Sequence, residues 1–138
     1  MDLSAINPVL LIASLMVAAT PLLLAAIGET VVEKAGVLNL GVEGMMIIGA
    51  IAGFATAVES GSPLLGFVAA AIAGAALSVL FALLTQFAQA NQVASGLSLT
   101  LFGLGLSALM GQSYVGIKPP QMGKLDIPVL SDLPVIGP

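Results

Sequence analysis

The 138-residue sequence contains no cysteine, no histidine, no tryptophan and no arginine. Without cysteine and histidine, the chain cannot form disulfides, zinc sites built on those residues, cysteine nucleophiles or histidine general bases. Its three lysines are too few for the basic surface that nucleic-acid binding requires. Charged residues make up 7% of the chain, whereas a soluble domain carries about 25%. These absences exclude a nucleic-acid binder and an ordinary soluble enzyme.

Apolar residues are abundant instead and make up 59% of the chain. Such a composition is the opposite of a disordered one. We therefore predict an integral membrane protein that contacts the lipid bilayer directly.

The spacing of the charges indicates the number of membrane spans. The stretch between Asp2 and Glu29 holds 26 uncharged residues, and the stretch between Glu59 and Lys118 holds 58. Since a membrane helix needs about 20 apolar residues, the first stretch fits one span and the second fits two. The 15 residues between Glu43 and Glu59 reach membrane length only with Glu43 inside the span. We predict an all-α polytopic bundle with spans at about 8–28, 37–58, 63–88 and 93–114.

Local signals mark the starts and one interruption of these helices. Asn7 and Ser62 each precede a proline, which is typical of a capped helix start. Pro21 lies inside the first span, where it either kinks the helix or divides it in two. From residue 115 to 138 the chain is rich in proline, which predicts an extramembrane segment. Within it, residues 127–130 either form a short strand or lie on the membrane surface.

Glu43 is the acid that the predicted second span places inside the membrane, where a carboxylate is energetically costly. It follows Asn39 within a stretch that holds Gly36, Gly41 and Gly44, which favours non-helical backbone at membrane depth. Such broken helices often mark transport sites, so Asn39 and Glu43 are candidate pathway residues. The alternative is a solvated Glu43 at the membrane interface.

Other polar side chains flank the spans. Asn91, Ser95 and Ser98 share one face at the start of the fourth span, where they either bond to other helices or line a path for a neutral polar solute. We expect Glu29, Glu33 and Lys34 on the connection before the second span, as a solvated loop face or as a docking site for a partner.

Small residues recur at helical spacing within the spans. They allow close helix packing, and the alternatives are a sliding surface or a dimer seam. The glycines concerned are Gly49, Gly53, Gly66, Gly74, Gly103 and Gly111. The sequence contains no phosphate-binding loop, no nucleophile elbow and no pair of acids in a water-accessible pattern, so we predict neither catalysis nor a resident metal or cofactor.

Four stretches resemble a known family. Residues 19–29 (ATPLLLAAIGE), 33–46 (EKAGVLNLGVEGMM), 91–101 (NQVASGLSLTL) and 127–138 (IPVLSDLPVIGP) are similar to bacterial ATP-binding-cassette (ABC) importer permeases of the nucleoside and simple-sugar group. That group is related to the ribose and branched-chain amino acid permeases. The resemblance extends from about residue 18 to the end of the chain.

The resemblance implies a multi-pass subunit of the bacterial plasma membrane. It would pair with a second permease subunit, cytoplasmic ABC ATPases that hydrolyse ATP, and an extracytoplasmic substrate-binding lipoprotein. The tail after residue 115 would lie outside the cell, and residues 29–36 and 89–92 would lie inside. Asn39 and Glu43 would lie near the path, with Asn91 and Ser95 at the start of a core helix. Because such permeases are about twice as long, the chain is expected to be an N-terminal fragment that cannot transport alone.

Two other functions fit the residues. The chain could be a self-sufficient small carrier or channel in which Glu43 relays protons or cations. It could also be a purely structural membrane subunit, which would show no solute flux in any context.

Overall fold

A computed structural model describes residues 7–123 of the chain, and within that range it contains helices and no strand. The long helices are α1 (Pro8–Lys34), α2 (Val42–Ser60), α3 (Pro63–Ala82) and α4 (Gln92–Gly111). A π-helical turn, η2 (Leu83–Phe87), extends α3, and a 3-10 turn, η3 (Gln112–Tyr114), extends α4. With these extensions, the structure has four helices that are long and apolar enough to cross a membrane. The all-α class predicted from the sequence is therefore confirmed.

The helix starts follow the capping residues of the sequence. The Asn7 side chain accepts a hydrogen bond from the Val9 amide at 3.0 Å, and the Ser62 hydroxyl accepts one from the Leu65 amide at 3.5 Å. Each cap precedes a proline at the first helical position, where the missing N–H is not needed. The predicted tail lies mostly beyond residue 123, and the possible strand at 127–130 lies outside the described residues.

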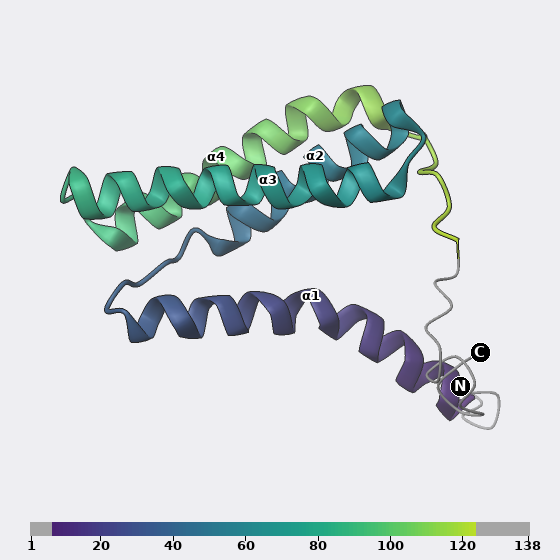
Figure 1. The fold of residues 1–138 in the computed structure, drawn as a ribbon, viewed down its shortest axis with the longest axis horizontal. Coiled ribbons are helices and arrows are strands. Elements are labelled where there is room, and N and C mark those ends of the chain that lie inside the picture. Colours follow the sequence, from purple (N-terminus) through teal and green to yellow (C-terminus); the bar gives the residue numbers. More distant parts are fainter. Residues whose placement is uncertain (1–6, 124–138) are drawn as a thin grey trace.

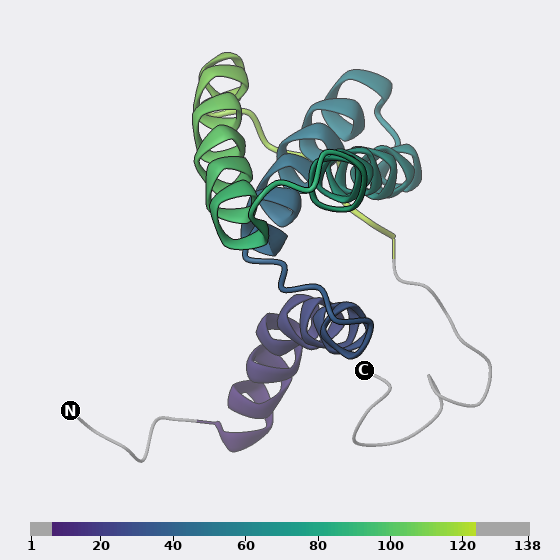
Figure 2. The same ribbon diagram turned by 90° about the vertical axis from the view of Figure 1, so that its left-hand side faces the viewer.

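Helix α1 is longer than the sequence predicted and passes through Pro21 without a break. Its direction changes along its length in Figures 1 and 2, as expected for a kink at an internal proline. The assignment of Glu29, Glu33 and Lys34 to a connection was wrong, because all three lie in the last turns of α1. An acid and a base at the edge of an apolar run do not stop a helix, and the stop signal is Gly36.

Gly36 ends α1 in a Schellman motif. Its φ is +83°, a left-handed conformation that glycine adopts without a Cβ clash. The Gly36 amide donates to the Glu33 carbonyl at 2.9 Å, and the Val37 amide donates to the Val32 carbonyl at 3.2 Å. These two bonds satisfy carbonyls that the helix end leaves open. The second helix then begins at Val42 and not near residue 37, because residues 35–41 stay non-helical.

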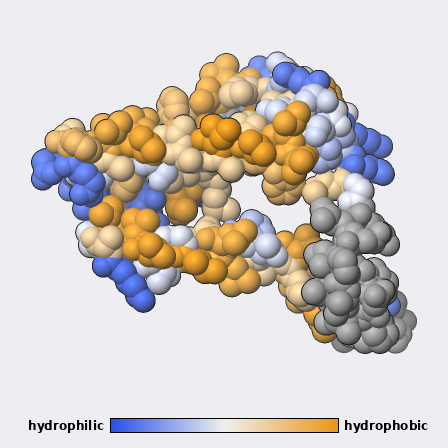
Figure 3. Space-filling model, viewed as in Figure 1, coloured by the Kyte–Doolittle hydropathy of each residue, from blue (hydrophilic) through white to orange (hydrophobic). Residues whose placement is uncertain are grey.

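Helix α2 lies between α3 and α4, whereas α1 lies to one side (Figure 2). A small core joins the three packed helices and consists of Met45, Ile48, Leu77, Phe81 and Leu99. In contrast, α1 has no buried residue. The outer surface seen in Figure 3 is largely apolar along the helices, with hydrophilic residues gathered near their ends. This distribution is that of a bundle surrounded by lipid or by other membrane helices.

Glycines bring α2 close to both neighbours. A Cβ built at Gly53 would lie 2.9 Å from the Gly66 carbonyl oxygen on α3, and one at Gly49 would lie 3.1 Å from the Ala70 carbonyl oxygen. On the other side, a Cβ at Gly103 of α4 would lie 2.8 Å from the Gly44 carbonyl oxygen. Close backbone approach of this kind provides the van der Waals contact that holds membrane helices together.

Gly74 and Gly111 approach α2 less closely. A Cβ at Gly74 would lie 3.6 Å from the Met45 carbonyl oxygen, which is ordinary contact. A Cβ at Gly111 would lie 3.9 Å from the Ile51 Cδ1. All six glycines that the sequence selected for helix packing therefore face a helix–helix contact with α2 or lie on it.

Candidate functional site

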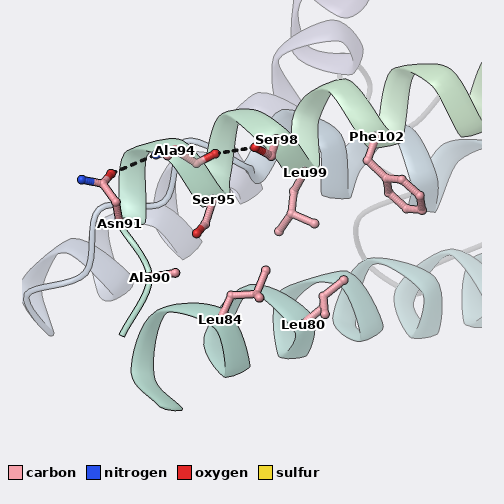
Figure 4. Close-up of a pocket in the computed structure, with 9 residues that line it drawn as sticks. All are labelled: Leu80, Leu84, Ala90, Asn91, Ala94, Ser95, Ser98, Leu99 and Phe102. Atoms are coloured by element: carbon pink, nitrogen blue, oxygen red, sulfur yellow. Dashed lines mark hydrogen bonds between the residues drawn. The ribbon is translucent and has the colours of Figure 1, made fainter. Parts of the chain in front are cut away.

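A groove opens between the end of α3 and the start of α4 and has a volume of about 430 Å³. Leu80 of α3 and Leu84 of η2 face Ser95, Leu99 and Phe102 of α4 across it (Figure 4). The remaining lining residues are Ala90, Asn91, Ala94 and Ser98. Three of the five pathway candidates taken from the sequence, Asn91, Ser95 and Ser98, are thus brought together at one groove.

Two of the three polar groups are already engaged within α4. Asn91 is the N-cap of α4, and its Oδ1 accepts from the Ala94 amide at 3.0 Å. The Ser98 hydroxyl donates to the Ala94 carbonyl at 2.7 Å. The half-buried Ser95 makes no side-chain hydrogen bond within residues 7–123 and points toward α3 in Figure 4. Ser95 and the free amide group of Asn91 are therefore the groups that can bond to a solute.

No charged residue lines this groove, and most of its lining is apolar. An apolar pocket with a few convergent hydroxyl and amide groups suits a neutral ligand with polar substituents. Residues 7–123 also contain no group of His, Cys, Asp or Glu that could hold a metal ion.

The other two pathway candidates lie away from the groove. Asn39 is buried, and its Oδ1 accepts from the Gly41 amide at 2.9 Å, while its Nδ2 lies 3.7 Å from the Met45 sulfur. Its side chain therefore shapes the turn that leads into α2. Glu43 is exposed in the first turn of α2, where a negative charge interacts favourably with the helix dipole.

The 35–41 segment, which connects α1 to α2, lies alongside the first turns of α4. A Cβ at Gly96 would lie 2.8 Å from the Gly41 amide nitrogen, so the two backbones touch. The Thr100 hydroxyl donates to the Leu40 carbonyl at 3.1 Å. Since Thr100 is eight residues after Gln92, the contact extends about 12 Å along α4. Non-helical backbone expected from the glycines is present here, packed against protein as such backbone requires in a membrane.

Polar side chains from α1 and α4 bond to this segment. These side chains are Glu29 of α1 and Gln92 and Thr100 of α4. Glu29 Oε1 accepts from the Asn39 amide at 3.1 Å, and Gln92 Oε1 accepts from the Leu38 amide at 2.7 Å. Glu29 is therefore half-buried and bonded within the chain, whereas Glu33 and Lys34 are exposed.

Sequence reasoning missed Gln92 and Thr100 as site residues, and it missed Gly96 as a packing residue. It associated Gly41 and Gly44 with non-helical backbone, which is correct for Gly41 but wrong for Gly44 in the first turn of α2, and it missed that both glycines contact α4. Gln92 lies in the polar cluster at the start of the fourth span, which was the available signal. Thr100 and Gly96 carry no such signal, because the partner of each lies more than fifty residues earlier in the chain.

Comparison with known proteins identifies the family. Residues 11–126 match the family of permease components of branched-chain amino acid transport systems. The chain belongs to this family of permeases.

Three relatives of the permease illustrate the range of the family. It is 34% identical over 148 residues to the guanosine ABC transporter permease protein NupQ of Bacillus subtilis, covering 99% of this chain and 46% of the relative. It is 33% identical over 139 residues to the nucleoside ABC transporter permease protein NupC of Lactococcus lactis, covering 93% and 44%. It is also 43% identical over 124 residues to TsgC13 of Haloferax volcanii, which is provisionally named a glucose ABC transporter permease protein, covering 87% and 38%.

The permease chain thus spans less than half the length of each of these curated relatives. No solved structure matches it.

Proposed function

We propose that the chain forms part of the membrane path of an ABC importer that carries a nucleoside or a simple sugar. The observation that carries this proposal is the family match over residues 11–126. The groove between α3 and α4 supports it, because three polar residues line it within an otherwise apolar wall and Ser95 points across it. As a permease component, the chain binds and guides solute, and ATP hydrolysis belongs to a partner subunit.

The substrate class follows from the chemistry of the groove and from the relatives. A groove without charged residues favours a neutral solute over an amino acid or a phosphate. Nucleosides and hexoses are neutral and carry several hydroxyl groups, which match the Ser95 hydroxyl and the Asn91 amide. The relatives named for guanosine, nucleosides and glucose fall in this class.

We propose that the partners are a second permease subunit, cytoplasmic ABC ATPases and an extracytoplasmic substrate-binding lipoprotein in the plasma membrane. The 35–41 segment and the α3–α4 turn lie at the same end of the bundle (Figure 1). We place that end on the cytoplasmic side. The Tyr114 hydroxyl bonds to Glu59 at the other end, which we place outside.

Uptake by the assembled transporter tests this proposal. The permease would be produced with its ATPase, receptor and second subunit in cells that lack nucleoside and sugar uptake. We expect ATP-dependent uptake of a labelled nucleoside or hexose, competed by the unlabelled compound. The Ser95→Phe variant fills the groove and should reduce uptake, whereas Ser113→Phe lies at the far end of α4 and should not. A receptor that binds no nucleoside or sugar, together with no uptake, would contradict the substrate assignment.

The alternative function, a self-sufficient carrier with Glu43 as a relay, remains a hypothesis that experiment can separate from the first. It predicts flux without any ATPase and dependence on the Glu43 carboxyl group. The family match favours the importer, and so does the position of Glu43 outside the groove.

A further inference from the structure

Two consecutive peptide groups of the 35–41 segment are held by acceptors from two different helices. The Leu38 amide donates to Gln92 of α4, and the Asn39 amide donates to Glu29 of α1. Glu29 makes this bond through Oε1 alone, because its Oε2 is buried without a hydrogen-bond partner among residues 7–123. The segment is therefore a bonded link between α1, which has no buried residue, and α4, which carries the groove.

Within a helix, the Leu38 and Asn39 amides would donate to backbone carbonyls. Here the side-chain oxygens of Gln92 and Glu29 accept these hydrogen bonds instead. A peptide N–H that is shielded from water and lacks a hydrogen-bond partner is disfavoured. The amide of the buried Asn39, which lies outside both helices, is such a donor, whereas Leu38 is exposed. Loss of Glu29 leaves the Asn39 amide without its acceptor, and loss of Gln92 releases the Leu38 amide from α4, so in either variant the segment is held less firmly. Because Gly41 contacts Gly96 directly, the segment cannot move without displacing the first turns of α4.

The first turns of α4 are also those that line the groove. Gln92 is next to Asn91 and three residues before Ser95, so the bond to Leu38 restricts rotation of this turn about the helix axis. We propose that Glu29 and Gln92 are positioning residues, which hold the 35–41 segment and thereby orient Asn91 and Ser95 toward the groove. This inference rests on the proposed function, in which the groove is part of the solute path.

Through this link, displacement of α1 reaches the groove although α1 does not line it. A change in the position of the Glu29 carboxylate moves Asn39, and the bonded segment carries that movement to Gly96 and Gln92. The coupling needs only the two hydrogen bonds and the glycine contact, all of which the structure contains.

Thiol labelling of the groove tests the positioning role directly. The chain has no cysteine, so Ser95→Cys introduces its one reactive thiol, and Ser113→Cys in η3 serves as a control at the other end of α4. The rate of modification by a small water-soluble maleimide would be measured in membranes that contain the assembled transporter. We expect Glu29→Ala and Gln92→Ala each to change the Ser95→Cys rate by about two- to tenfold, which corresponds to the net loss of one hydrogen bond. The Ser113→Cys rate should not change.

Conservative variants separate positioning from a general loss of structure. Glu29→Gln and Gln92→Glu keep an acceptor oxygen at each position and should restore the wild-type labelling rate. Glu33→Ala is the matched control on α1, because Glu33 is exposed and its side chain bonds to nothing within residues 7–123. If an alanine variant does not accumulate, Glu29→Asp, one methylene shorter, tests the same contact and should give an intermediate rate.

An unchanged Ser95→Cys rate in Glu29→Ala and Gln92→Ala would overturn the inference, as would equal changes in Glu29→Gln and Glu29→Ala. Labelling requires no substrate, so its outcome is independent of the transported solute. A transporter that carries neither nucleoside nor sugar would refute the proposed function and leave the labelling result unaffected.

Discussion

Gly103 of α4 rests on the backbone of Gly44 in α2. A Cβ at Gly103 would lie 2.8 Å from the Gly44 carbonyl oxygen and 2.9 Å from the Gly44 Cα. Backbone atoms cannot move aside as a flexible side chain can, so alanine at either position must push the two helices apart. This contact lies within the packed unit of α2, α3 and α4, which also contains the groove and contacts the 35–41 segment.

Gly103→Ala should therefore destabilise the bundle by about 1–3 kcal/mol, the usual result of overpacking a close contact. Gly105→Ala is the matched control on the same helix, since a Cβ there meets nothing within 4 Å. Gly105→Ala reduces the backbone freedom of the unfolded chain, so it should raise stability by up to about 1 kcal/mol. Reversible unfolding in mixed micelles measures both variants, and equal stabilities would show that the glycine contact is not tight.

Gly36→Ala tests the end of α1. At the Gly36 φ of +83° an added Cβ is strained, and the left-handed conformation costs about 1–2 kcal/mol for other residues. Gly36→Asn should be milder, because asparagine tolerates this conformation better than alanine does. Gly28→Ala in α1 serves as a control, as a Cβ there meets nothing within 4 Å. The same unfolding assay should rank the variants Gly28→Ala, Gly36→Asn and Gly36→Ala, from most to least stable.

How much of this arrangement the sequence could predict depends on the range of the interactions. Helix existence follows from runs of apolar residues and from local caps such as Asn7 and Ser62, so the number of helices was predictable. The close contacts of Gly49, Gly53 and Gly66 follow from small residues at helical spacing. In each of these cases the signal lies within a few residues of the feature.

The features that could not be predicted depend on distant partners. Whether Glu29 is solvated or bonded depends on the Asn39 amide, which is presented by non-helical backbone after α1 ends. Gly41 and Gly44 both contact α4. A glycine in such a contact looks the same in sequence as one that interrupts a helix, so only the position of α4 shows the contact. The groove itself requires the register of α3 against α4, which no local pattern encodes.

Asn91 caps α4 in the structure, and we propose that it also binds solute; substitution can separate these two roles. As the N-cap of α4, it accepts from the Ala94 amide, and its removal in Asn91→Ala should cost about 1 kcal/mol of stability. Asn91→Asp keeps the cap and the stability but replaces the amide donor at the groove with a charge. If the amide bonds to a neutral solute, Asn91→Asp should reduce uptake several-fold in the assembled transporter while unfolding like the wild type. Wild-type uptake by Asn91→Asp would remove Asn91 from the list of pathway residues.

Glu43→Gln distinguishes the importer from the self-sufficient carrier. Glu43 is exposed in the first turn of α2 and does not line the groove, so in the importer its carboxyl group is not required for solute movement. Glu43→Gln should retain ATP-dependent uptake and lose only a small helix-dipole contribution, about 0.3–1 kcal/mol.

The measurement for Glu43→Gln is flux in proteoliposomes, with and without the ATPase and with and without a proton gradient. A carrier that uses Glu43 as a relay would show gradient-driven flux without ATPase, and Glu43→Gln would abolish that flux because an amide cannot release a proton. Glu33→Gln, another exposed acid that becomes an amide, controls for the change in charge. Loss of flux in Glu43→Gln but not in Glu33→Gln, with no need for ATP, would overturn the importer assignment. Retained ATP-dependent uptake in both variants would leave the groove, and not Glu43, as the part of this chain that handles solute.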